Sequence, residues 1–276
     1  MHAFGCLHLS NQMAFVTLLS DFGLQDASVA ITKGLLMQHI PDATIVDVSH
    51  QVETYNTHQA AYLLLSSYRN FPKGSCHILL FDVFSEPDPR LLLCEFDGHY
   101  MLAPDNGVMS LAFGEKLKNV WLCHTLKMPG RFNEWLQKAG ETVAKLQRNT
   151  PEKLGLKEGN LKVAPHQWLP VQVGNAVECH VIHIDHYQNV VINMTKEQFE
   201  AIGQGRPFRI QFARNEEITK LSSHFYEVAP SEKLCRFNST GFLEICINRG
   251  KAASLFGLSL FQEEAFIYNT INIYFA

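Results

Sequence analysis

The sequence predicts an α/β protein: an N-terminal α/β domain with a mainly parallel sheet, followed by a smaller C-terminal domain that is a β-barrel or sandwich. Two observations predict this division. Up to about residue 149, apolar strand-like runs alternate with helical patterns, which is typical of a parallel sheet covered on both faces. After residue 171, short strand-like runs are separated by polar turns, which is typical of antiparallel sheets. We therefore place the domains at residues 13–160 and 171–276.

The first half of the chain repeats the order strand, helix, strand. Continuous apolar runs predict buried strands at residues 14–20, 43–49 and 76–82. The helix after the first strand is expected to begin at Asp26, which is a suitable N-cap, and to end at residue 39 before Pro41. A second helix is expected to begin at the N-cap Asn56 and to end at residue 70 before Pro72.

The rest of the N-terminal domain contains a hairpin and a third helix. Residues 91–96 and 99–104 flank an Asp97-Gly98 pair, which is a strong signal for a two-residue hairpin turn. Residues 131–149 predict a helix, because apolar side chains recur there at helical spacing. The apolar positions are Trp135, Leu136, Ala139, Val143 and Leu146. From residue 150 to 170 the composition changes to Pro, Gly, Lys and Asn, which predicts a linker.

The C-terminal domain is expected to consist mostly of strands. They are predicted at residues 176–185, 189–194, 206–213, 241–248 and 265–276, with one short helix at 196–202. Short polar turns separate these runs, so a small barrel or sandwich is the expected architecture.

Composition excludes several classes of protein. The 276 residues carry a formal net charge of -4, and 46% of them are hydrophobic, as expected for a globular protein with a sizeable core. The absence of a Lys/Arg-rich run argues against nucleic acid or an anionic membrane as a partner. No apolar run reaches the roughly 18–20 residues that a membrane-spanning helix needs.

The N-terminal residues and the cysteines indicate the compartment. The first twelve residues lack the basic start and long apolar block of a signal peptide, and Met13 is an alternative start. The seven cysteines are odd in number and widely scattered, which favours reduced thiols. We therefore expect a cytoplasmic protein.

Common cofactor motifs do not occur. There is no GxGxxG, no GxxxxGK[ST], no GxSxG and no CxxC, which weakens nucleotide, NAD and structural zinc interpretations. The run "HVIHIDH" places His180, His183 and His186 three residues apart, but a strand would turn His183 away from the other two. We expect no metal site here.

Three segments combine acids, amides and turn residues at predicted strand ends: 21–28, 82–90 with 104–107, and 185–189. Each by itself is more often a capped turn than a binding site. Together they supply carboxylates for a sugar diol and amides for the edge of a base. Asp21 ends the first strand, where ligands bind in open α/β sheets, and its carboxylate is suited to a ribose 2′,3′-diol. From the residues alone we infer an α/β enzyme domain and a β domain that bind a small polar ligand.

Several of these segments together resemble one known family. The matching stretches are "TLLSDFGLQDASVAITKGLL", "PDATIVDVSH", "AAYLLLSSYRNFPKGSCHILLFD", "APDNGVMS", "VIHIDHYQNVVIN" and "NSTGFLEICINRGKAASLFGL". In this order they resemble the S-adenosyl-methionine (SAM) hydroxide adenosyltransferases, the SAM hydrolases related to fluorinase and chlorinase, from Phe15 to Leu258. The resemblance implies an α/β domain, a β domain and a homotrimer with sites between neighbouring subunits. It implies SAM as substrate and no cofactor.

The resemblance also implies roles for individual residues. Asp21 would bind the ribose hydroxyls, and the C-terminal domain would hold the methionine and adenine ends. The remaining substrate-binding residues it implies are Asp26, Ala27 and Ser28 near the methionine or ribose, Tyr55 beside the nucleoside, Asp185 at the methionine ammonium, Tyr187 and Asn189 on the adenine side, Ser239 at the methionine carboxylate, and the backbone from Ile247 to Arg249 at the adenine edge. Tyr55 as a core aromatic, Ser239 as a turn residue and Asn189 as a hairpin corner remain the simpler alternatives.

The family reaction is displacement at ribose C5′ by water, with methionine as leaving group. The sulfonium leaves as a neutral thioether, so no general acid is needed, and the site must orient water and remove its proton. The family uses an Asp, an Arg and a His for this. Asp82 matches the Asp and Arg90 best matches the Arg, but Pro129 stands where the His is expected. Gln188 also replaces a glycine of the family turn.

Two functions follow from these departures, and a third, weaker alternative is another adenosyl-transfer enzyme that uses a different nucleophile. In the first, the protein is a SAM hydrolase in which Asp82 and Arg90, or another group such as His124, position the water. In the second, it binds SAM or adenosine without cleaving it, because Pro129 cannot transfer a proton. Halogenation is disfavoured, because a carboxylate at Asp82 would repel a halide by roughly 4 kcal/mol at 4 Å with an effective dielectric constant of 20.

Overall fold

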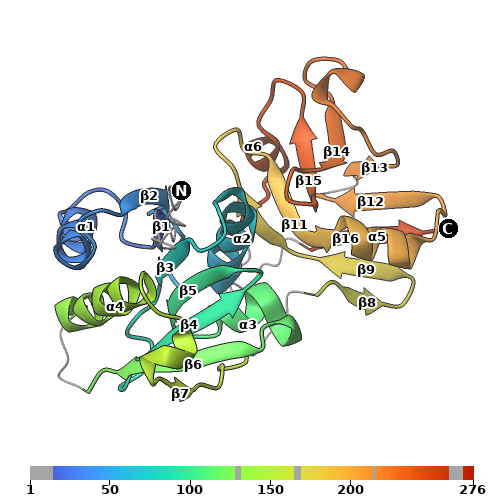
Figure 1. Cartoon of the computed structure of the whole chain (residues 1–276). Coiled ribbons are helices and arrows are strands. Elements are labelled where there is room, and N and C mark those ends of the chain that lie inside the picture. Colours follow the sequence, from blue (N-terminus) through green and yellow to red (C-terminus); the bar gives the residue numbers. More distant parts are fainter. Residues whose placement is uncertain (1–14, 128–131, 165–168, 214–215, 261–269) are drawn as a thin grey trace, which may run out of the picture. The chain divides into compact units, whose positions relative to one another are not determined.

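The chain forms two compact units, residues 1–165 and 166–276, shown in a computed structural model in Figure 1. The structure describes residues 15–127, 132–164, 169–213, 216–260 and 270–276. Pro129, which replaces the expected histidine, lies outside the described residues, as does Met13. No helix among the described residues is both long and apolar enough to cross a membrane.

The N-terminal unit is built on one seven-stranded sheet, which confirms the predicted α/β class. Its strands lie in the order β2-β1-β3-β5-β4-β6-β7. Their bounds are β1 Phe15–Ser20, β2 Thr44–Ser49, β3 Cys76–Leu80, β4 Arg90–Phe96, β5 His99–Pro104, β6 Asn119–Thr125 and β7 Lys157–Glu158. The first four strands in that order are parallel, and β4, β6 and β7 extend the sheet antiparallel. The sheet is therefore parallel where β1 and β3 bring their carboxyl ends together.

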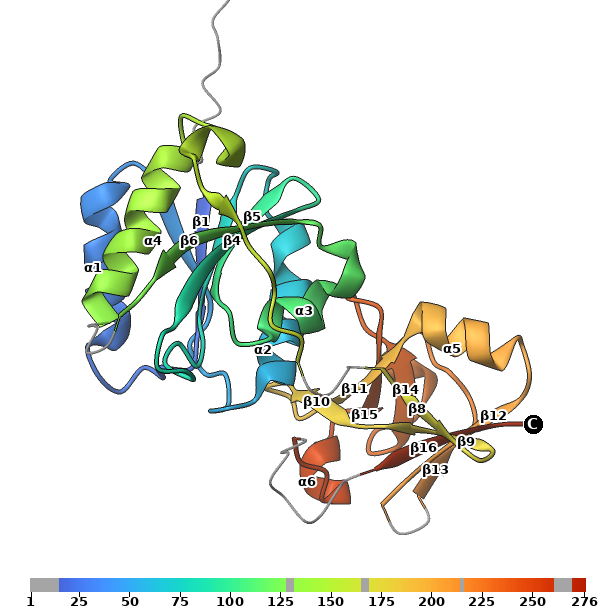
Figure 2. The ribbon, with the colours of Figure 1, turned by 90° about the horizontal axis from the view of Figure 1, so that it is seen from below.

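Helices cover both faces of this sheet. They are α1 Ser28–His39, α2 Thr57–Ser67, α3 Val108–Phe113 and α4 Phe132–Leu146, with short 3₁₀ turns at Tyr68–Asn70 (η1), Gly114–Lys116 (η2) and Pro151–Leu154 (η3). In Figure 2, α1 and α4 lie together on one face and α2 and α3 on the other. Trp135 and Leu136 of α4 are fully buried in one core with Leu36 of α1 and apolar residues of β1, β3 and β4. The predicted apolar face of α4 is thus confirmed.

The helix N-cap and the hairpin turn predicted from the sequence are confirmed in this unit. The Asn56 side chain accepts a hydrogen bond from the Gln59 backbone N–H at 2.9 Å, so Asn56 is the N-cap of α2 as predicted. Asp97 and Gly98 both have positive φ, as a tight hairpin turn between β4 and β5 requires. The first helix differs by one residue. Ala27 is its N-cap position, but Asp26 accepts from the Ser28 N–H at 2.8 Å and still satisfies a first-turn donor.

Part of the predicted linker belongs to the sheet. The strand β7 (Lys157–Glu158) pairs with β6, and the Lys162 N–H donates to the Asp105 carboxylate at 2.7 Å. The polar, Gly-containing composition of this segment predicts a linker because it has no apolar periodicity. Its order comes from backbone hydrogen bonds to the N-terminal unit, which composition does not reveal.

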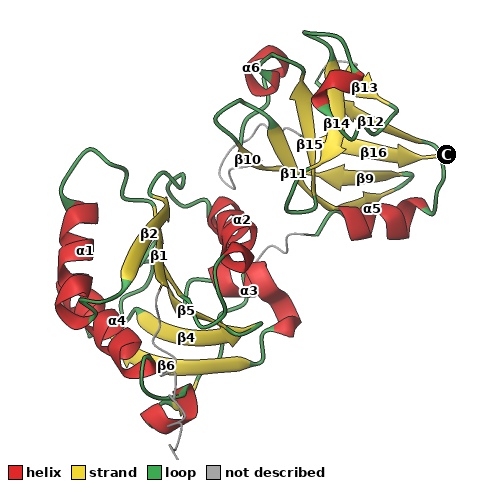
Figure 3. Ribbon diagram, turned by 45° about the horizontal axis from the view of Figure 1, so that its top comes forward, coloured by secondary structure: helices red, strands yellow, loops and turns green. Residues whose placement is uncertain are grey.

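The C-terminal unit consists of two antiparallel sheets around one core (Figure 3). One has the order β10-β11-β15-β14 and the other β13-β12-β16-β9-β8. The strands are β8 Val171–Val173, β9 Ala176–Cys179, β10 Val181–Ile184, β11 Val190–Thr195, β12 Phe208–Phe212, β13 Glu216–Ile218, β14 Lys233–Phe237, β15 Phe242–Ile247 and β16 Ile271–Phe275. Among the described residues the sheets remain separate and do not close into a barrel, so the sandwich alternative fits.

Two short helices and one 3₁₀ turn complete this unit: α5 Lys196–Gly203, α6 Ala252–Phe256 and η4 Phe225–Glu227. The predicted helix at 196–202 is thus confirmed. Thr195 begins α5 with a reciprocal capping box, in which its hydroxyl accepts from Gln198 N–H and the Gln198 side chain accepts from Thr195 N–H. The strand β14 was not predicted, because charged residues interrupt its apolar pattern.

Candidate functional site

Two carboxylates meet at the carboxyl ends of neighbouring parallel strands in the N-terminal unit. Asp21 follows β1, and Asp82 lies two residues beyond the end of β3. The Asp82 backbone N–H donates to Asp21 Oδ2 at 3.2 Å. The parallel pairing of β1 with β3, with Ser20 opposite Leu80, brings these residues together although 61 positions separate them. This is the edge at which open α/β sheets bind ligands.

The electrostatics of this pair favour proton transfer. Burial raises the pKa of Asp21, although hydrogen bonds from backbone N–H groups oppose the shift. Burial also raises the pKa of Asp82, and the nearby Asp21 charge raises it further. A carboxylate with a raised pKa is a better proton acceptor at neutral pH than an ordinary Asp. The pair therefore combines a hydrogen-bond acceptor for hydroxyl groups with a candidate general base.

The backbone at Asp82 has an unusual conformation. Its φ is 44°, in the left-handed region that costs a non-glycine residue about 1–2 kcal/mol. The Asn106 side chain donates to the carbonyl of Phe81 at 2.8 Å and so holds the preceding peptide. Strain of this kind persists only where the surrounding structure fixes it, and it is concentrated at functional sites.

Arg90, the other predicted catalytic residue, is the first residue of β4. Its guanidinium forms an ion pair with the buried Asp105 carboxylate and donates to the carbonyl of Asn160 at 3.2 Å. The Arg90 side chain remains 37% exposed. Its charge is therefore already balanced by a carboxylate, and a role in orienting water would depend on the donors that this pair leaves available.

A lysine that sequence reasoning missed lies in the electrostatic surroundings of Asp82. The Lys162 ammonium pairs with Glu86, and its charge lowers the pKa of Asp82 against the larger effect of burial. Lys162 falls in the segment that was predicted to be a linker, which is why it was not considered. No pattern in the sequence relates it to Asp82, because only the chain path of residues 157–164 brings it there.

Aromatic side chains adjoin the carboxylate turn. The ring of Phe132 packs edge-on against Phe22, with centroids 5.3 Å apart, and against Phe84 at 6.1 Å. Phe22 directly follows Asp21, and Phe84 follows Asp82 by two residues. Aromatic faces of this kind exclude water and supply stacking surface for a planar ligand.

Of the remaining predicted residues of this unit, Asp26, Ala27 and Tyr55 are exposed and Ser28 is half-buried. Hydrogen bonds from Ser28 lower the pKa of Asp26, whose side chain is tied to the start of α1. Ala27 and Ser28 form that helix start. Tyr55 is 83% exposed with a φ of 62°, so the alternative of a core aromatic is wrong. An exposed aromatic next to the N-terminus of α2 is available for stacking, as the nucleoside role requires.

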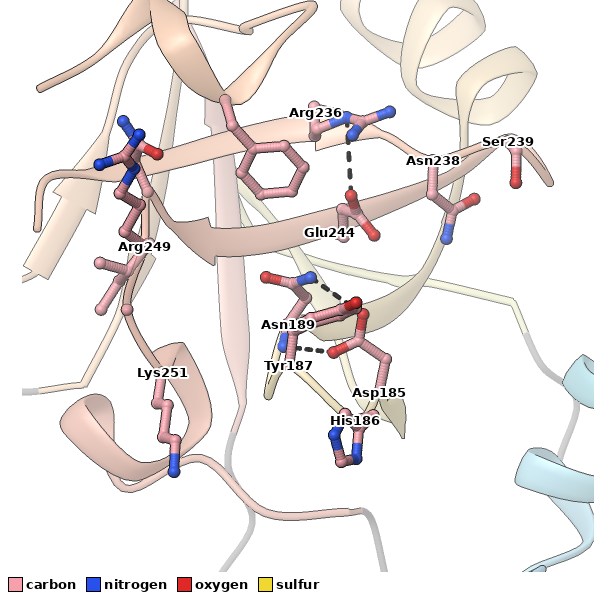
Figure 4. A pocket seen from close by; sticks show the side chains of 14 residues that line it. Asp185, His186, Tyr187, Asn189, Arg236, Asn238, Ser239, Glu244, Arg249 and Lys251 are labelled. Carbon is pink, nitrogen blue, oxygen red and sulfur yellow. Dashed lines mark hydrogen bonds and ion pairs between the residues drawn. The ribbon is translucent and has the colours of Figure 1, made fainter. Parts of the chain in front are cut away.

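The C-terminal unit contains a cavity of about 830 Å³ (Figure 4). Its volume is within the range of sites for ligands the size of a drug or cofactor. The cavity brings together all the residues predicted for this unit: Asp185, Tyr187, Asn189, Ser239, Ile247 and Arg249. They come from the β10–β11 turn, the β14–β15 turn and the end of β15. Strand pairing between β10, β11, β15 and β14 places these turns around one opening.

Asp185 and Asn189 act as one unit in this cavity. The Asp185 carboxylate accepts from the Asn189 backbone N–H at 2.8 Å and from the Asn189 side-chain amide at 2.9 Å (Figure 4). These bonds fix both side chains. They leave the side-chain amide oxygen of Asn189 (Oδ1) as a rigid acceptor. Asn189 is buried, and the simpler reading of it as a hairpin corner is also met, because it closes the β10–β11 turn.

Glu244 and Arg236 also line the cavity and were not predicted. Arg236 Nε lies 3.6 Å from Glu244 Oε1 (Figure 4). The guanidinium also lies 5.2 Å from the centroid of the Phe225 ring. Burial raises the pKa of Glu244, while Arg236 opposes that shift. The alternation in "GFLEICIN" was a usable signal, because it sets Glu244 apart as the single charge in an apolar strand.

Ser239 lies in the β14–β15 turn, where Asn238 Oδ1 accepts from the backbone N–H groups of Thr240 and Phe242. It therefore is a turn residue, as the simpler alternative holds, and it lines the cavity as well. Arg249 follows β15 with a left-handed φ of 56°, which turns the chain from Ile247 toward α6.

His124, the sequence-based candidate to replace the expected histidine, already has a partner. His124 on β6 lies 3.3 Å from Glu134 of α4, so that ring nitrogen already has a partner. The described residues contain no group of three His, Cys, Asp or Glu side chains that could hold a metal ion.

Comparisons with known proteins give one family for both units. The model for the SAM hydroxide adenosyltransferase N-terminal domain matches residues 16–137, and that for the C-terminal domain of the same family matches residues 179–263. The (R)-S-adenosyl-L-methionine hydrolase of Methanocaldococcus jannaschii is 25% identical over 266 residues, which cover 92% of this chain and 95% of that protein. A fluorinase of Actinopolyspora mzabensis is 40% identical over 60 residues, 22% of this chain and 20% of that protein.

A solved structure has the same fold. The crystal structure of an uncharacterized conserved protein from Thermotoga maritima matches 94% of this chain and 99% of that chain with a TM-score of 0.78. The sequences are 22% identical. The two family models and this structural match together cover both the α/β and the β unit.

Proposed function

The chain belongs to the SAM hydroxide adenosyltransferase family, and we propose that it hydrolyses S-adenosyl-L-methionine at ribose C5′ to adenosine and L-methionine. Relatives that match nearly the whole chain are named (R)-S-adenosyl-L-methionine hydrolase, which supports this activity. The structural observation that carries the proposal is the carboxylate pair Asp21 and Asp82 at the ends of β1 and β3.

The carboxylates of Asp21 and Asp82 have different roles in the proposed reaction. Asp21 accepts hydrogen bonds from the ribose hydroxyls, which fixes C5′. The Asp82 carboxylate accepts a hydrogen bond from the attacking water and takes its proton. The raised pKa of Asp82, caused by burial and by Asp21, suits it to this task.

The bonds and charges of the step balance without a cofactor. The water oxygen forms a bond to C5′ while the C5′–S bond breaks, and the electron pair of that bond stays on sulfur. The positive sulfonium becomes the neutral thioether of methionine, and the water loses one proton through Asp82 to solvent. A neutral leaving group needs no acid. The expected histidine would therefore act on the attacking water, and its replacement by Pro129 does not affect departure of the leaving group.

The C-terminal cavity, taken by itself, is suited to the adenine and methionine groups of SAM. The side-chain amide oxygen of Asn189 can accept a hydrogen bond from an adenine amino group. Tyr187, which is 73% exposed, offers an aromatic face for stacking. The Asp185 carboxylate can accept hydrogen bonds from an ammonium group, while Arg236, Arg249 and Lys251 of the same lining can meet a ligand carboxylate. These roles agree with those that the family resemblance implies.

Binding without cleavage is the second candidate function. Pro129 favours it, since a proline ring neither accepts nor donates a proton, and the pairing of Arg90 with Asp105 also favours it by occupying the second catalytic side chain. Asp82 favours hydrolysis, because a binder has no need of a strained, half-buried carboxylate at this point.

The test is incubation with SAM in water enriched in ¹⁸O, with and without chloride, followed by mass spectrometry of the products. Hydrolysis at C5′ gives adenosine that carries ¹⁸O, and methionine without it. Asp82→Asn is expected to lower kcat by about 10²–10⁴-fold, as for loss of a general base. Asp88→Asn is the matched control, because Asp88 is an exposed acid of the same loop.

Each outcome decides between the candidates. Labelled adenosine from the unmodified chain and from Asp88→Asn, but not from Asp82→Asn, supports hydrolysis. Failure to form products while SAM or adenosine raises the melting temperature supports the binder. A 5′-chloro product would overturn the electrostatic argument against halogenation.

The assembly and the compartment are further parts of the proposal. We infer a homotrimer with sites between neighbouring subunits, and a cytoplasmic location, from the family resemblance and the scattered cysteines. The six cysteines among the described residues are all free thiols, which agrees with a reducing compartment. Multi-angle light scattering at micromolar concentration tests the assembly, and a clean monomer would count against sites between subunits.

A further inference from the structure

A buried histidine contacts the turn that carries Asp21. His50 directly follows the strand β2 and is 4% exposed. Its Nδ1 lies 2.7 Å from the hydroxyl of Ser20, the last residue of β1, which is fully buried. The Ser20 hydroxyl also accepts from the Phe22 N–H at 3.4 Å. The approach of Nε2 to the Asp47 carboxylate at 3.0 Å favours the tautomer with the ring hydrogen on Nε2, in which the Ser20 hydroxyl donates to Nδ1.

The second ring nitrogen of His50, Nε2, lies near a more exposed carboxylate, that of Asp47. His50 Nε2 lies 3.0 Å from Asp47 Oδ1, and Asp47 pairs with Lys33 of α1 at 2.6 Å. Partial burial opposes ionisation of Asp47, but interactions with Lys33 and His50 outweigh it and hold its pKa below the usual value. The carboxylate charge favours a hydrogen on Nε2, although the 3.0 Å approach does not have the geometry of a full hydrogen bond.

The main chain of His50 holds the other end of the same turn. Its carbonyl accepts from the Gly23 N–H at 2.6 Å, and the Val52 N–H donates to the Ser20 carbonyl at 3.3 Å. Gly23 has a φ of 70°, which a glycine adopts at little cost. Ser20 and Gly23 are therefore both hydrogen-bonded to His50, and Asp21 lies between them in the sequence.

Ser20, His50 and Asp47 resemble a catalytic triad in composition only. Ser20 is fully buried, so no substrate can reach its hydroxyl. The ring is also reversed, since in hydrolytic triads Nε2 faces the serine and Nδ1 the carboxylate. These three side chains consequently act on the turn and not on a substrate.

We propose that His50 is a positioning residue for Asp21: its contact with Ser20 holds the turn so that the Asp21 carboxylate meets the Asp82 N–H and the ribose. This rests on the proposed hydrolase function. Nothing else among the described contacts fixes both ends of the turn. A shift of about 1 Å in such a group can lower a rate about 10²-fold, so the contact has a measurable consequence.

Two substitutions separate the two halves of the His50 ring. In His50→Asn the side-chain amide occupies the place of Nδ1, so it keeps a partner for Ser20 and loses Asp47. In His50→Gln the longer amide reaches the place of Nε2, so it keeps Asp47 and loses Ser20. Both replace the ring by an amide of similar polarity, which makes them matched controls for each other.

The expected result is a difference between these variants that thermal stability does not follow. His50→Gln, like Ser20→Ala, is expected to lower kcat/KM for SAM by about tenfold to a hundredfold, and His50→Asn to stay within about threefold of the unmodified chain. Melting temperatures are measured in parallel. Equal losses of activity in both variants, or losses that follow the melting temperature, would show a merely structural role and overturn the proposal.

A second measurement keeps the test independent of the activity. The carboxyl carbons of Asp21 and Asp82 are titrated by ¹³C NMR in each variant. His50→Gln is expected to shift the apparent pKa values of the pair, and His50→Asn to leave them in place. If the unmodified chain cleaves no SAM, the proposed function fails, but this titration still decides the role of His50. Identical titrations in all variants would overturn it.

Discussion

Gln188 adopts a left-handed backbone conformation, with φ of 63°, at the place where the sequence resemblance implies a glycine. Its side chain offsets part of this cost. The amide oxygen accepts from the backbone N–H of Ser254 at 3.2 Å and from the Ser254 hydroxyl, while the Gln188 carbonyl accepts from the Ala253 N–H at 3.0 Å. Lys251, the N-cap residue of α6, makes no side-chain cap bond, so Gln188 supplies the cap from another segment.

Two substitutions of Gln188 are expected to differ in stability. Gln188→Ala keeps the backbone strain and loses the cap, so it should lower the free energy of unfolding by about 1 kcal/mol. Gln188→Gly loses the same cap but relieves strain of about 1–2 kcal/mol, so it should be nearly neutral. Urea denaturation of both variants measures the difference. If the glycine variant proves the less stable of the two, backbone strain is not the cost at this position.

At the scale of elements, the packing of α1 on α4 depends on one small residue. Gly140 lies in the middle of α4, where glycine is unfavourable by about 1 kcal/mol relative to alanine. A Cβ atom built there would lie 2.7 Å from Cδ2 of His39, at the end of α1, and 3.2 Å from its Cβ. The helices therefore approach closely at this point because Gly140 has no side chain.

The substitution Gly140→Ala is expected to lower the free energy of unfolding by about 1–3 kcal/mol, because the strain of overpacking exceeds the gain in helix propensity. In a chain that already carries His39→Ala, the same change should be close to neutral or stabilising, since the ring is gone. A double-mutant cycle by thermal or urea unfolding gives the coupling energy. Additive effects would mean that α1 moves away without cost.

At the scale of the whole molecule, a buried pair of histidines makes the N-terminal unit sensitive to acid. His77 on β3 is 1% exposed, its Nδ1 lies 2.8 Å from the Thr17 hydroxyl, and its Nε2 lies 3.2 Å from Nδ1 of His99. Burial, and then the neighbouring His99, lower the pKa of His77 to about 3. Burial lowers the pKa of His99 as well. The His77 ring is therefore neutral in the folded chain at neutral pH.

Stability is expected to fall as the pH falls from 7 toward 5. An unfolded histidine takes up a proton near pH 6.5 while folded His77 does not, so the unfolded state binds more protons in this range and stability rises with pH. The loss between pH 7 and pH 5 should be about 2 kcal/mol for His77. Urea denaturation at several pH values measures this slope.

The control for this prediction is His77→Gln, which removes the titrating group. Its absolute stability is expected to differ, so the comparison concerns the slope against pH only. The slope should become shallower, with the remainder coming from His99 and other groups. An unchanged slope would mean that His77 is protonated in the folded chain.

The sequence by itself determined the elements whose signals are local. Asn56 caps α2, the Asp97-Gly98 pair turns the β4–β5 hairpin, and the apolar spacing of Trp135 and Leu136 buries one face of α4. Each follows from residues within one or two turns of the chain, where propensity and periodicity act directly. The two-part fold class and the family followed from the same patterns and from the matching segments.

Only the tertiary structure decided which of these residues meet. Parallel pairing of β1 with β3 joins Asp21 to Asp82, and the path of residues 157–164 brings Lys162 into the surroundings of that pair, where composition had predicted a linker. The pairing of β10, β11, β15 and β14 likewise gathers six predicted residues, with Glu244 and Arg236, around one cavity. A sequence fixes the chemistry of each side chain, but contacts between distant residues depend on strand register and topology, which are set by burial over the whole unit.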